Sequence, residues 1–274
     1  MNVGEALRLG AERLTAAGSQ TARLDAELLL GDTLGLARVE LYTGFDRPLN
    51  GGEREAFESR LERRELHEPV AYILGEWGFR RLTLRTDRRA LIPRPETEVV
   101  VERCLARLDG CQAPAVLDVG TGTGAIALAI ADERRDARVT AIDASPDALA
   151  LARENAERTG LQIELELRDL FVDFPPGPWH LVVSNPPYVD PEELPTLMPD
   201  VRDWEPHLAL VGRGATEGVV RGAAAALVSG GSLVLEVGDG QARAVAALLA
   251  DNGFGGVTVT ADLNGRDRVV EGGR

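Results

Sequence analysis

The sequence predicts an α/β protein in which a mostly parallel sheet follows a small helical domain. From Ala115 onward, short apolar runs typical of buried strands alternate with helical stretches. Such alternation produces a parallel sheet with helices on both faces. The turn signal Asn264-Gly265 joins the last two strand-like runs, so we expect a closing hairpin that inserts one antiparallel strand.

The residues before about Leu66 read as the helices of a small bundle. One apolar face at helical spacing comprises Val3, Ala6, Leu7, Ala11 and Leu14. A second comprises Leu24, Leu28 and Leu29. A charged helix follows Pro48, and we expect its Phe57 and Leu61 to point inward.

A short bridge connects the helical part to the α/β part. The alternation over residues 77–84 predicts a two-stranded hairpin. The stretch from Arg94 to Glu98 then predicts the start of a helix, because Pro95 suits a first turn, where a missing N–H costs nothing. Glu96 and Glu98 suit the positive end of the helix dipole, and a role facing a cofactor is the alternative.

The α/β part follows a regular order of elements. The predicted strands cover residues 115–119, 139–142, 163–167, 181–183, 233–237, 257–260 and 269–270. The predicted helices cover residues 125–134, 146–158, 217–228 and 242–249. No internal repeat and no low-complexity tract interrupts this order.

Composition narrows the class of partner. The 274 residues carry a formal net charge of −14, and their number suits one large domain plus a smaller one. A charge this negative disfavours an extended surface for nucleic-acid phosphates and favours a protein or small-molecule substrate. The apolar runs are too short to span a bilayer, and no secretory pattern opens the chain. We therefore expect a cytoplasmic protein without a membrane partner.

The cysteines and histidines point to no metal chemistry. Cys104 and Cys111 form no Cys-x-x-Cys pair, and the three histidines are scattered. Reduced, structural cysteines are the usual case in the cytosol. The sequence thus predicts neither a disulfide framework nor a metal site.

A glycine-rich turn after the first strand predicts a nucleotide-type cofactor site. The run from Asp118 to Gly124 carries three glycines, which let a ligand approach the backbone closely. Asp143 follows the second strand, where an acid accepts hydrogen bonds from ribose hydroxyls. The spacing G-x-G-x-G differs from the G-x-G-x-x-G of NAD sites and favours adenosylmethionine. A glycine turn that binds nothing is the bland alternative.

A second motif, Ser184 to Tyr188, follows the fourth strand at the edge of the sheet where ligands bind. Its two prolines stiffen the loop that carries Asn185 and Tyr188. An amide nitrogen is a poor nucleophile, so methyl transfer to it requires orientation of its NH₂ group. The Asn185 side-chain oxygen and the Pro186 carbonyl can accept those two hydrogens, and the Tyr188 ring can pack on the planar group. No strong general base is needed, because positioning supplies most of the acceleration. In isolation the same tetrapeptide would read as a rigid surface turn.

Together these motifs resemble class I methyltransferases that act on amino groups. Three further stretches resemble one family among them, the release factor glutamine N5-methyltransferases (HemK/PrmC family). They are residues 91–98 (Leu-Ile-Pro-Arg-Pro-Glu-Thr-Glu), 205–210 (Glu-Pro-His-Leu-Ala-Leu) and 265–270 (Gly-Arg-Asp-Arg-Val-Val). The resemblance implies a Rossmann-like sheet of seven strands, with an N-terminal release-factor-binding domain over residues 1–72. It further implies a hairpin linker over 73–90 and a catalytic domain over 91–274.

The resemblance also assigns site residues. The cofactor, S-adenosyl-L-methionine, would contact Gly120, Thr121, Gly122, Thr123, Gly124, Asp143, Leu170 and Asn185. The catalytic residues would be Asn185, Pro186 and Tyr188. The substrate would lie on Asn185, Pro186, Pro187, Tyr188 and Val189. Some relatives carry an aromatic residue at the position of Leu170, so the adenine contact falls either to Leu170 or to Phe171.

The family resemblance implies a substrate as well: the glutamine of the Gly-Gly-Gln motif in peptide-chain release factors. We expect a monomer that takes release factors as partners and no nucleic acid as a direct substrate. The alternatives are a glutamine methyltransferase acting on a ribosomal protein and a nucleic-acid amino-group methyltransferase. A silent adenosylmethionine-binding protein and a nicotinamide oxidoreductase are the more distant alternatives.

Overall fold

The computed structural model describes residues 1–274, and the chain forms two compact units. The first comprises Met1–Glu76 together with Met198–Trp204, and the second comprises Trp77–Leu197 together with Glu205–Arg274.

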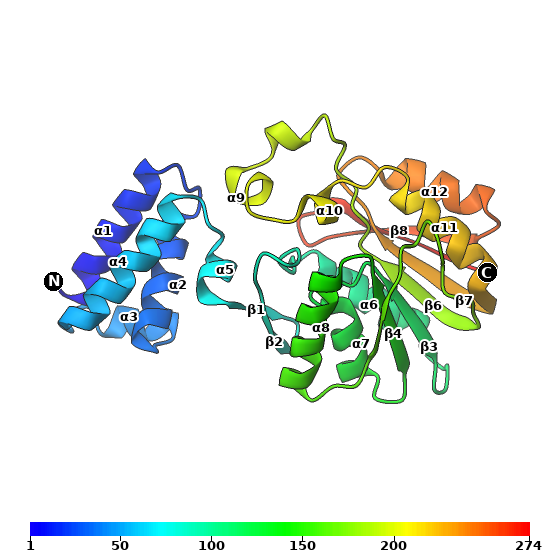
Figure 1. The fold of residues 1–274 in the computed structure, drawn as a ribbon, viewed down its shortest axis with the longest axis horizontal. Helices are drawn as coiled ribbons and strands as arrows, with labels where there is room; N and C mark the ends of the chain where they lie inside the picture. Colours follow the sequence, from blue (N-terminus) through cyan, green and yellow to red (C-terminus); the bar gives the residue numbers. More distant parts are fainter. The chain divides into compact units, whose positions relative to one another are not determined.

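The first unit is a helical bundle, and its part up to Glu76 is drawn in blue and cyan in Figure 1. Its helices are α1 (Val3–Ala16), α2 (Ala22–Leu34), α3 (Arg38–Thr43), α4 (Gly51–Glu65), α5 (Val70–Leu74) and α9 (Pro199–Arg202). Helices α1 and α4 each begin with a capping box, in which an asparagine side chain accepts from the third N–H and a glutamate returns the bond. These reciprocal bonds explain why both helices start where they do.

The core of the bundle is largely the predicted one. Phe57 and Leu61 are 2% exposed, and Leu7 and Leu14 are fully buried. The face predicted for α2 is wrong at Leu24, which is 38% exposed. The buried face of α2 instead runs through Ala22, Asp25, Ala26, Leu29 and Leu30. The polar Asp25 broke the apolar pattern, yet it is buried because Arg64 pairs with it.

Residues 198–204 join this bundle although they are far from it in sequence. Arg64 donates from Nε to Asp25 at 2.8 Å and from Nη2 to Asp200 at 3.4 Å. Trp204 Nε1 donates to the carbonyl of Leu66 at 3.2 Å. The segment that follows the Asn-Pro-Pro-Tyr motif therefore leaves the second unit and returns to it.

The second unit is built on a seven-stranded sheet, which confirms the predicted fold class. Its strands are β3 (Ala115–Val119), β4 (Arg138–Asp143), β5 (Glu164–Leu167), β6 (Trp179–Ser184), β7 (Leu227–Glu236), β8 (Gly255–Ala261) and β9 (Asp267–Gly273). Their order is β5-β4-β3-β6-β7-β9-β8. The first five strands in this order, from β5 to β7, pair in parallel. Strand β9 is antiparallel to both β7 and β8. The closing hairpin thus inserts one antiparallel strand, as expected.

Helices cover both faces of this sheet (Figure 1). Their bounds are α6 (Thr97–Arg107), α7 (Ala125–Glu133), α8 (Pro146–Thr159), α10 (His207–Leu210), α11 (Ala215–Ala226) and α12 (Ala242–Asp251). One apolar core gathers α6 and α7, and the other gathers α11 and α12. The hairpin of β1 (Glu76–Phe79) and β2 (Leu82–Arg85) adds Phe79 and Leu84 to the first core.

Other details differ from the sequence-based expectation; residues 227–228, predicted as the end of a helix, begin β7. Helix α6 starts at Thr97, so Pro95 and Glu96 lie in a turn before it and not in its first turn. The stretch after the Asn-Pro-Pro-Tyr motif contains three short elements that the sequence did not reveal: α9, α10 and a 3₁₀ turn at Leu194–Thr196. Each is four residues or shorter, too short for a periodic pattern. None of the helices has the length and apolar character needed to cross a membrane.

Candidate active site

A cavity of about 370 Å³ opens at the carboxyl ends of β3, β4 and β6. It is lined by residues 120–123 of the glycine loop, though not by Gly124, and by Asp143, Leu170, Phe171, Asn185 and Pro187. The segment from Arg89 to Arg94 forms a further wall. The carboxyl edge of a parallel sheet is where α/β folds bind their ligands, so both sequence motifs reach one cavity.

The glycine loop owes its shape to positive φ angles. Gly120, Gly122 and Gly124 have φ of 76°, 57° and 82°, a region that side chains other than glycine rarely adopt. The N–H groups of Gly120 and Thr121 both donate to the carbonyl of Ile142, at 2.9 and 3.0 Å. A Cβ on Gly124 would lie 3.3 Å from the Cβ of Ala152, so this glycine also lets α7 and α8 approach closely. The turn is therefore fixed by hydrogen bonds to β4 and by close packing against α8.

Asp143, at the end of β4, is held by the backbone. Its Oδ2 accepts from the N–H of Gly122 and its Oδ1 from the N–H of Ser145, each at 2.9 Å. Burial raises the pKa of this carboxyl above its usual value, although these N–H groups act in the opposite direction. Each carboxylate oxygen can accept more than one hydrogen bond. Both oxygens therefore remain able to accept from a ribose diol, which the adenosyl group of the expected cofactor carries.

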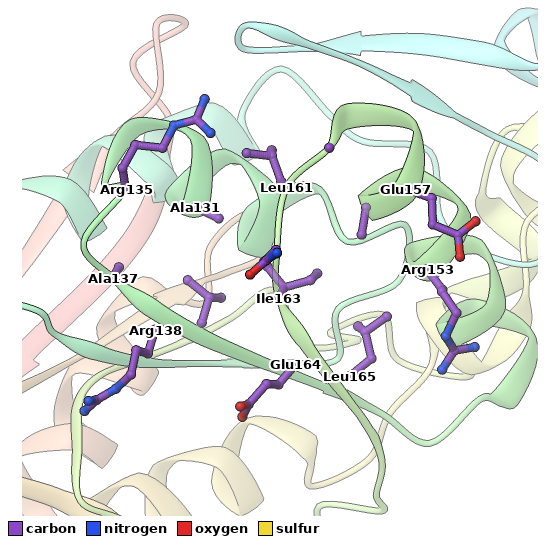
Figure 2. Close-up of a pocket in the computed structure, with 14 residues that line it drawn as sticks. Ala131, Arg135, Ala137, Arg138, Arg153, Glu157, Leu161, Ile163, Glu164 and Leu165 are labelled. Atoms are coloured by element: carbon purple, nitrogen blue, oxygen red, sulfur yellow. The ribbon is translucent and has the colours of Figure 1, made fainter.

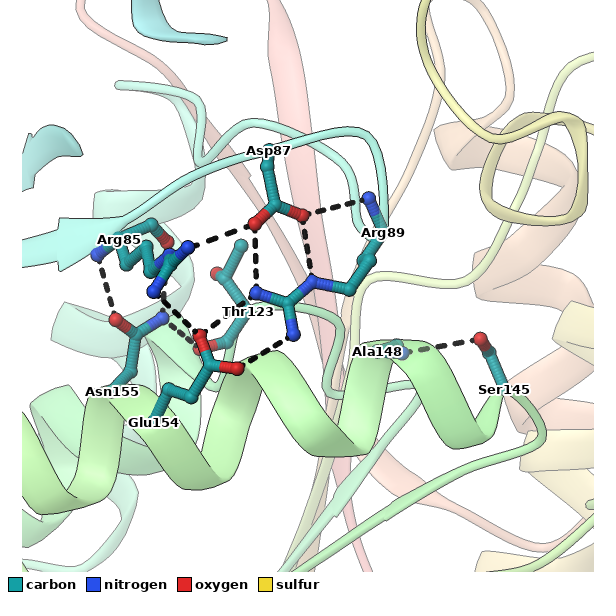
Figure 3. A network of polar contacts seen from close by, with 8 residues as sticks. All are labelled: Arg85, Asp87, Arg89, Thr123, Ser145, Ala148, Glu154 and Asn155. Atoms are coloured by element: carbon teal, nitrogen blue, oxygen red, sulfur yellow. Dashed lines mark hydrogen bonds and ion pairs between the residues drawn. The ribbon is translucent and has the colours of Figure 1, made fainter. Parts of the chain in front are cut away.

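Asn155, which the sequence did not single out, ties this loop to the hairpin. Its Oδ1 accepts from the Arg85 N–H at 2.6 Å, and its Nδ2 donates to the carbonyls of Arg85 and Thr123 at 3.1 and 2.9 Å. Figure 3 shows Asn155 on α8 between these two backbones, with Arg89 beside it bridging Asp87 and Glu154. The only hint in the sequence is a polar residue on the otherwise apolar face of α8.

The Asn-Pro-Pro-Tyr loop is packed tightly against backbone. A Cβ on Gly212 would lie 2.5 Å from Cγ of Pro187, and one on Gly238 would lie 2.9 Å from Cδ2 of Tyr188. Gln241 donates from Nε2 to the Tyr188 carbonyl at 3.0 Å. At the near end, the buried Ser184 hydroxyl donates to the Val119 carbonyl at 2.7 Å. The loop is therefore rigid for reasons beyond its two prolines.

The predicted substrate residues divide into two groups. Asn185 and Pro187 line the cavity, while Pro186 is buried and Tyr188 turns its hydroxyl toward Glu236, 3.5 Å from Oε1. Val189 donates its N–H to the Leu210 carbonyl at 3.0 Å. Burial raises the pKa of Tyr188 to about 12, so this phenol stays protonated at neutral pH.

The two candidates for the adenine contact both reach the cavity. Leu170 and Phe171 each line it. Leu170 is half-buried against α11, where a Cβ on Gly218 would lie only 2.4 Å from its Cδ1. Phe171 is 58% exposed. A flat apolar surface that is free to receive a ring is therefore offered by Phe171 more than by Leu170.

A second and larger hollow, of about 1040 Å³, lies at the opposite ends of β4 and β5. Its lining includes Arg135, Arg138 and Arg153. Figure 2 shows these three guanidinium groups at separate corners of the hollow, directed away from one another. They do not converge on a common point where an anion would sit, and no motif from the sequence reaches this hollow.

Asp118 gives the candidate site a stability that depends on pH. It is fully buried at 0% exposure and accepts from the Thr121 hydroxyl at 2.7 Å. Burial raises its pKa from 3.8 to about 7. Between those values the folded protein holds a proton that the unfolded chain has released, so the free energy of unfolding falls as pH rises through this range.

We expect Asp118→Asn to remove that penalty, because an amide does not ionise. The variant should melt higher relative to the wild type at pH 8 than it does at pH 5, as measured by thermal unfolding. Asp136→Asn is the control, since Arg134 holds the pKa of Asp136 near 2 and both pH values lie above that. A difference for Asp118→Asn that is equal at both pH values would contradict the assignment.

Comparison with known proteins assigns both parts of the chain. Residues 5–75 match the family description "PrmC N-terminal domain", and residues 97–198 match "Methyltransferase small domain". A crystal structure of a methyltransferase from Pyrococcus furiosus superposes with a TM-score of 0.53 at 16% identity, covering 69% of this chain and 87% of that one. At that identity the likeness concerns the fold alone.

Similarity to curated relatives extends over nearly the whole chain. A release factor glutamine methyltransferase of Geobacter sulfurreducens is 42% identical over 265 residues, covering 94% of this chain and 92% of the relative. One of Cereibacter sphaeroides is 43% identical over 279 residues, covering 98% of each. The resemblance noted in the sequence is thereby confirmed, and the chain belongs to the family of release factor glutamine methyltransferases.

Proposed function

We propose that this protein transfers a methyl group from S-adenosyl-L-methionine to the side-chain N5 of the glutamine in the Gly-Gly-Gln motif of peptide-chain release factors. The observation that carries the proposal is that Asn185 and the glycine loop with Asp143 line one cavity. A methyl donor and an amide acceptor bound there would be neighbours. Family membership adds support from sequence, since the relatives carry the name of this activity.

The residues at the cavity fit the cofactor. The run Gly120, Thr121, Gly122, Thr123 and Gly124 would receive it along the open backbone, and Asp143 would accept from its ribose hydroxyls. Phe171 or Leu170 would pack on its adenine. When bound, the cofactor supplies an electrophilic methyl group on a positively charged sulfur. The chain's own task is then to present the amide nitrogen to that methyl.

Asn185 and Pro186 would orient the amide. The side-chain oxygen of Asn185 and the carbonyl of Pro186 each accept one hydrogen of the NH₂ group, which leaves the nitrogen lone pair facing the cavity. Alkylation makes the nitrogen acidic, so its proton leaves without a strong base. Orientation of this kind accelerates a reaction by holding the reacting atoms in the attacking geometry.

The remaining loop residues would hold the glutamine side chain. Pro187 lines the cavity and would contact the substrate directly. Tyr188 and Val189 would complete the binding surface, and the anchoring of this loop by Gln241 keeps it in place before the substrate arrives. Because the loop is rigid in advance, little ordering remains to be done on binding.

We assign the parts of the chain on the same basis. Residues 1–72 would bind the release factor, 73–90 would act as the hairpin linker, and 91–274 would carry catalysis. The net charge of −14 fits a protein partner better than nucleic-acid phosphates. The enzyme would work as a monomer in the cytoplasm, where translation termination takes place.

Incubation with each class of candidate substrate tests the function directly. The purified protein is incubated with labelled cofactor and separate pools of release factor, ribosomal protein, RNA and DNA. We expect label in release factor alone, and mass spectrometry should place one added methyl on the Gly-Gly-Gln glutamine. Label in a ribosomal protein or a nucleic acid, with none in release factor, would overturn the substrate assignment.

Asp143→Ala should weaken binding of the cofactor. Two hydrogen bonds to a charged carboxylate are lost, so we expect a dissociation constant roughly 100-fold higher or more in calorimetry. Asp251→Ala, at an exposed aspartate on α12, is the control and should bind normally. Unchanged affinity in a folded Asp143→Ala variant would remove this residue from the site.

Asn185→Ala should abolish most turnover while leaving the protein folded. The variant loses one of two acceptors that orient the amide, so we expect kcat on release factor to fall roughly 100-fold or more. Asn252→Ala serves as the control, because that side chain only bonds the Leu248 carbonyl at the end of α12. Near-normal turnover of Asn185→Ala would refute the orientation mechanism.

A further inference from the structure

Asn185 belongs to a chain of polar groups whose mutual contacts the sequence did not predict. Thr97, the first residue of α6, donates its hydroxyl to Oε2 of Glu236 at 2.6 Å. Asn185 donates from Nδ2 to the same Thr97 oxygen at 3.4 Å. Thr97 is 4% exposed and Glu236 is 1% exposed. The loop after β6, strand β7 and helix α6 thus contribute one residue each.

With Glu236 ionised and the Asn185 amide in the orientation observed, the hydrogens in this chain run in one direction. The NH₂ group of Asn185 can only donate, so Thr97 must accept from it. The single hydroxyl hydrogen of Thr97 is then directed to Glu236, whose Oε2 accepts. With Nδ2 committed to Thr97, the carbonyl Oδ1 is the Asn185 atom left for a ligand.

We propose that Thr97 and Glu236 are positioning residues that set the orientation of the Asn185 amide and so present Oδ1, and not Nδ2, to the substrate NH₂ group. A flipped Asn185 amide would direct its own NH₂ hydrogens at the NH₂ hydrogens of the substrate. The inference rests on the proposed role of Asn185 as an acceptor. It adds a reason why that side chain adopts the orientation on which the role depends.

The surroundings of Glu236 are consistent with a function beyond stability. Burial raises its pKa from 4.5 to about 7, against the lowering effect of the Thr97 hydroxyl and of Arg268, while Glu96 adds repulsion. Arg268 itself donates from Nη1 to the Val237 carbonyl at 3.1 Å. A buried carboxyl without a closely paired cation costs folding free energy. In either protonation state Oε2 can remain the acceptor for Thr97, because a proton can reside on Oε1, beside Tyr188.

The substitution pair Thr97→Val and Thr97→Ser separates the hydroxyl from the shape of the side chain. Valine matches threonine in shape but has no hydroxyl, and serine restores it. We expect Thr97→Val to lower kcat on release factor roughly 10- to 100-fold, with KM for release factor and cofactor affinity within about twofold of wild type. Thr97→Ser should recover most of kcat. Thr140→Val is the matched control, since it removes a buried hydroxyl that bonds Glu164 and neither residue lines the cavity, so its kcat should be unchanged.

A double-substitution cycle shows whether Thr97 acts through Asn185. In an Asn185→Ala background, measured by single turnover with excess enzyme, Thr97→Val should cost no further rate. An equal loss in both backgrounds would overturn the proposal, as would wild-type kcat in Thr97→Val. A normal rate for Asn185→Ala alone would instead refute the acceptor role itself, which keeps the two failures distinct.

Glu236 provides the same test from the other end of the chain. Glu236→Gln retains an oxygen that accepts from Thr97, whereas Glu236→Leu does not. We expect the glutamine variant to keep kcat within about fivefold and the leucine variant to match Thr97→Val. Circular dichroism and thermal unfolding verify that each variant is folded, and if Thr97→Val does not fold, the Glu236 pair decides the question. Equal kcat for the two Glu236 variants would overturn the proposal that Glu236 positions Asn185 through Thr97.

Discussion

The parallel pairing of β4, β3 and β6 is the constraint on which the site depends. Val119, the last residue of β3, pairs with Ile142 on one side and with Ser184 on the other. The residues that follow these three positions begin the glycine loop, supply Asp143 and supply Asn185. Parallel strands carry their carboxyl ends to one edge, so three segments separated by up to 65 residues in sequence meet there.

Buried polar side chains then convert this approximate meeting into a defined geometry. Ser184 bonds the end of β3, Asn155 joins the hairpin to the glycine loop, and Thr97 connects Asn185 with Glu236. Each of these bonds has a modest net worth, about 1 kcal/mol, but each would leave a buried group unsatisfied if broken. The raised pKa values of Asp118 and Glu236 show that part of this geometry is maintained at a cost in stability. Around the cavity, the positions of the side chains are thus maintained at the expense of folding stability.

The local sequence pattern was sufficient to predict the sheet and the positions of the two motifs. It was insufficient wherever a side chain contacts a residue that is distant in sequence. Every predicted strand is present, because each is a short apolar or alternating run between turns. Leu24 was placed inside on periodicity alone, whereas the true face of α2 includes Asp25, which is buried only because Arg64 lies 39 residues further on. The union of residues 198–204 with the helical unit, and the contacts of Asn155 and Glu236, likewise depend on partners that no window of sequence contains. The individual roles of the site residues stay predictions from motif and geometry.

The placement of titratable groups agrees with a reaction limited by orientation. An acid–base mechanism would need a group with a pKa near neutrality facing the substrate. Glu236 has such a pKa, yet its carboxyl lies behind the loop, where Thr97 and Tyr188 occupy it. Tyr188 is held protonated by its raised pKa of about 12, so it acts as a donor and not as a base. What faces the cavity from this loop is the neutral amide of Asn185 and the ring of Pro187, which can orient a planar group but cannot remove its proton. The chemistry of an amide nitrogen, which loses its proton only after alkylation, requires nothing more.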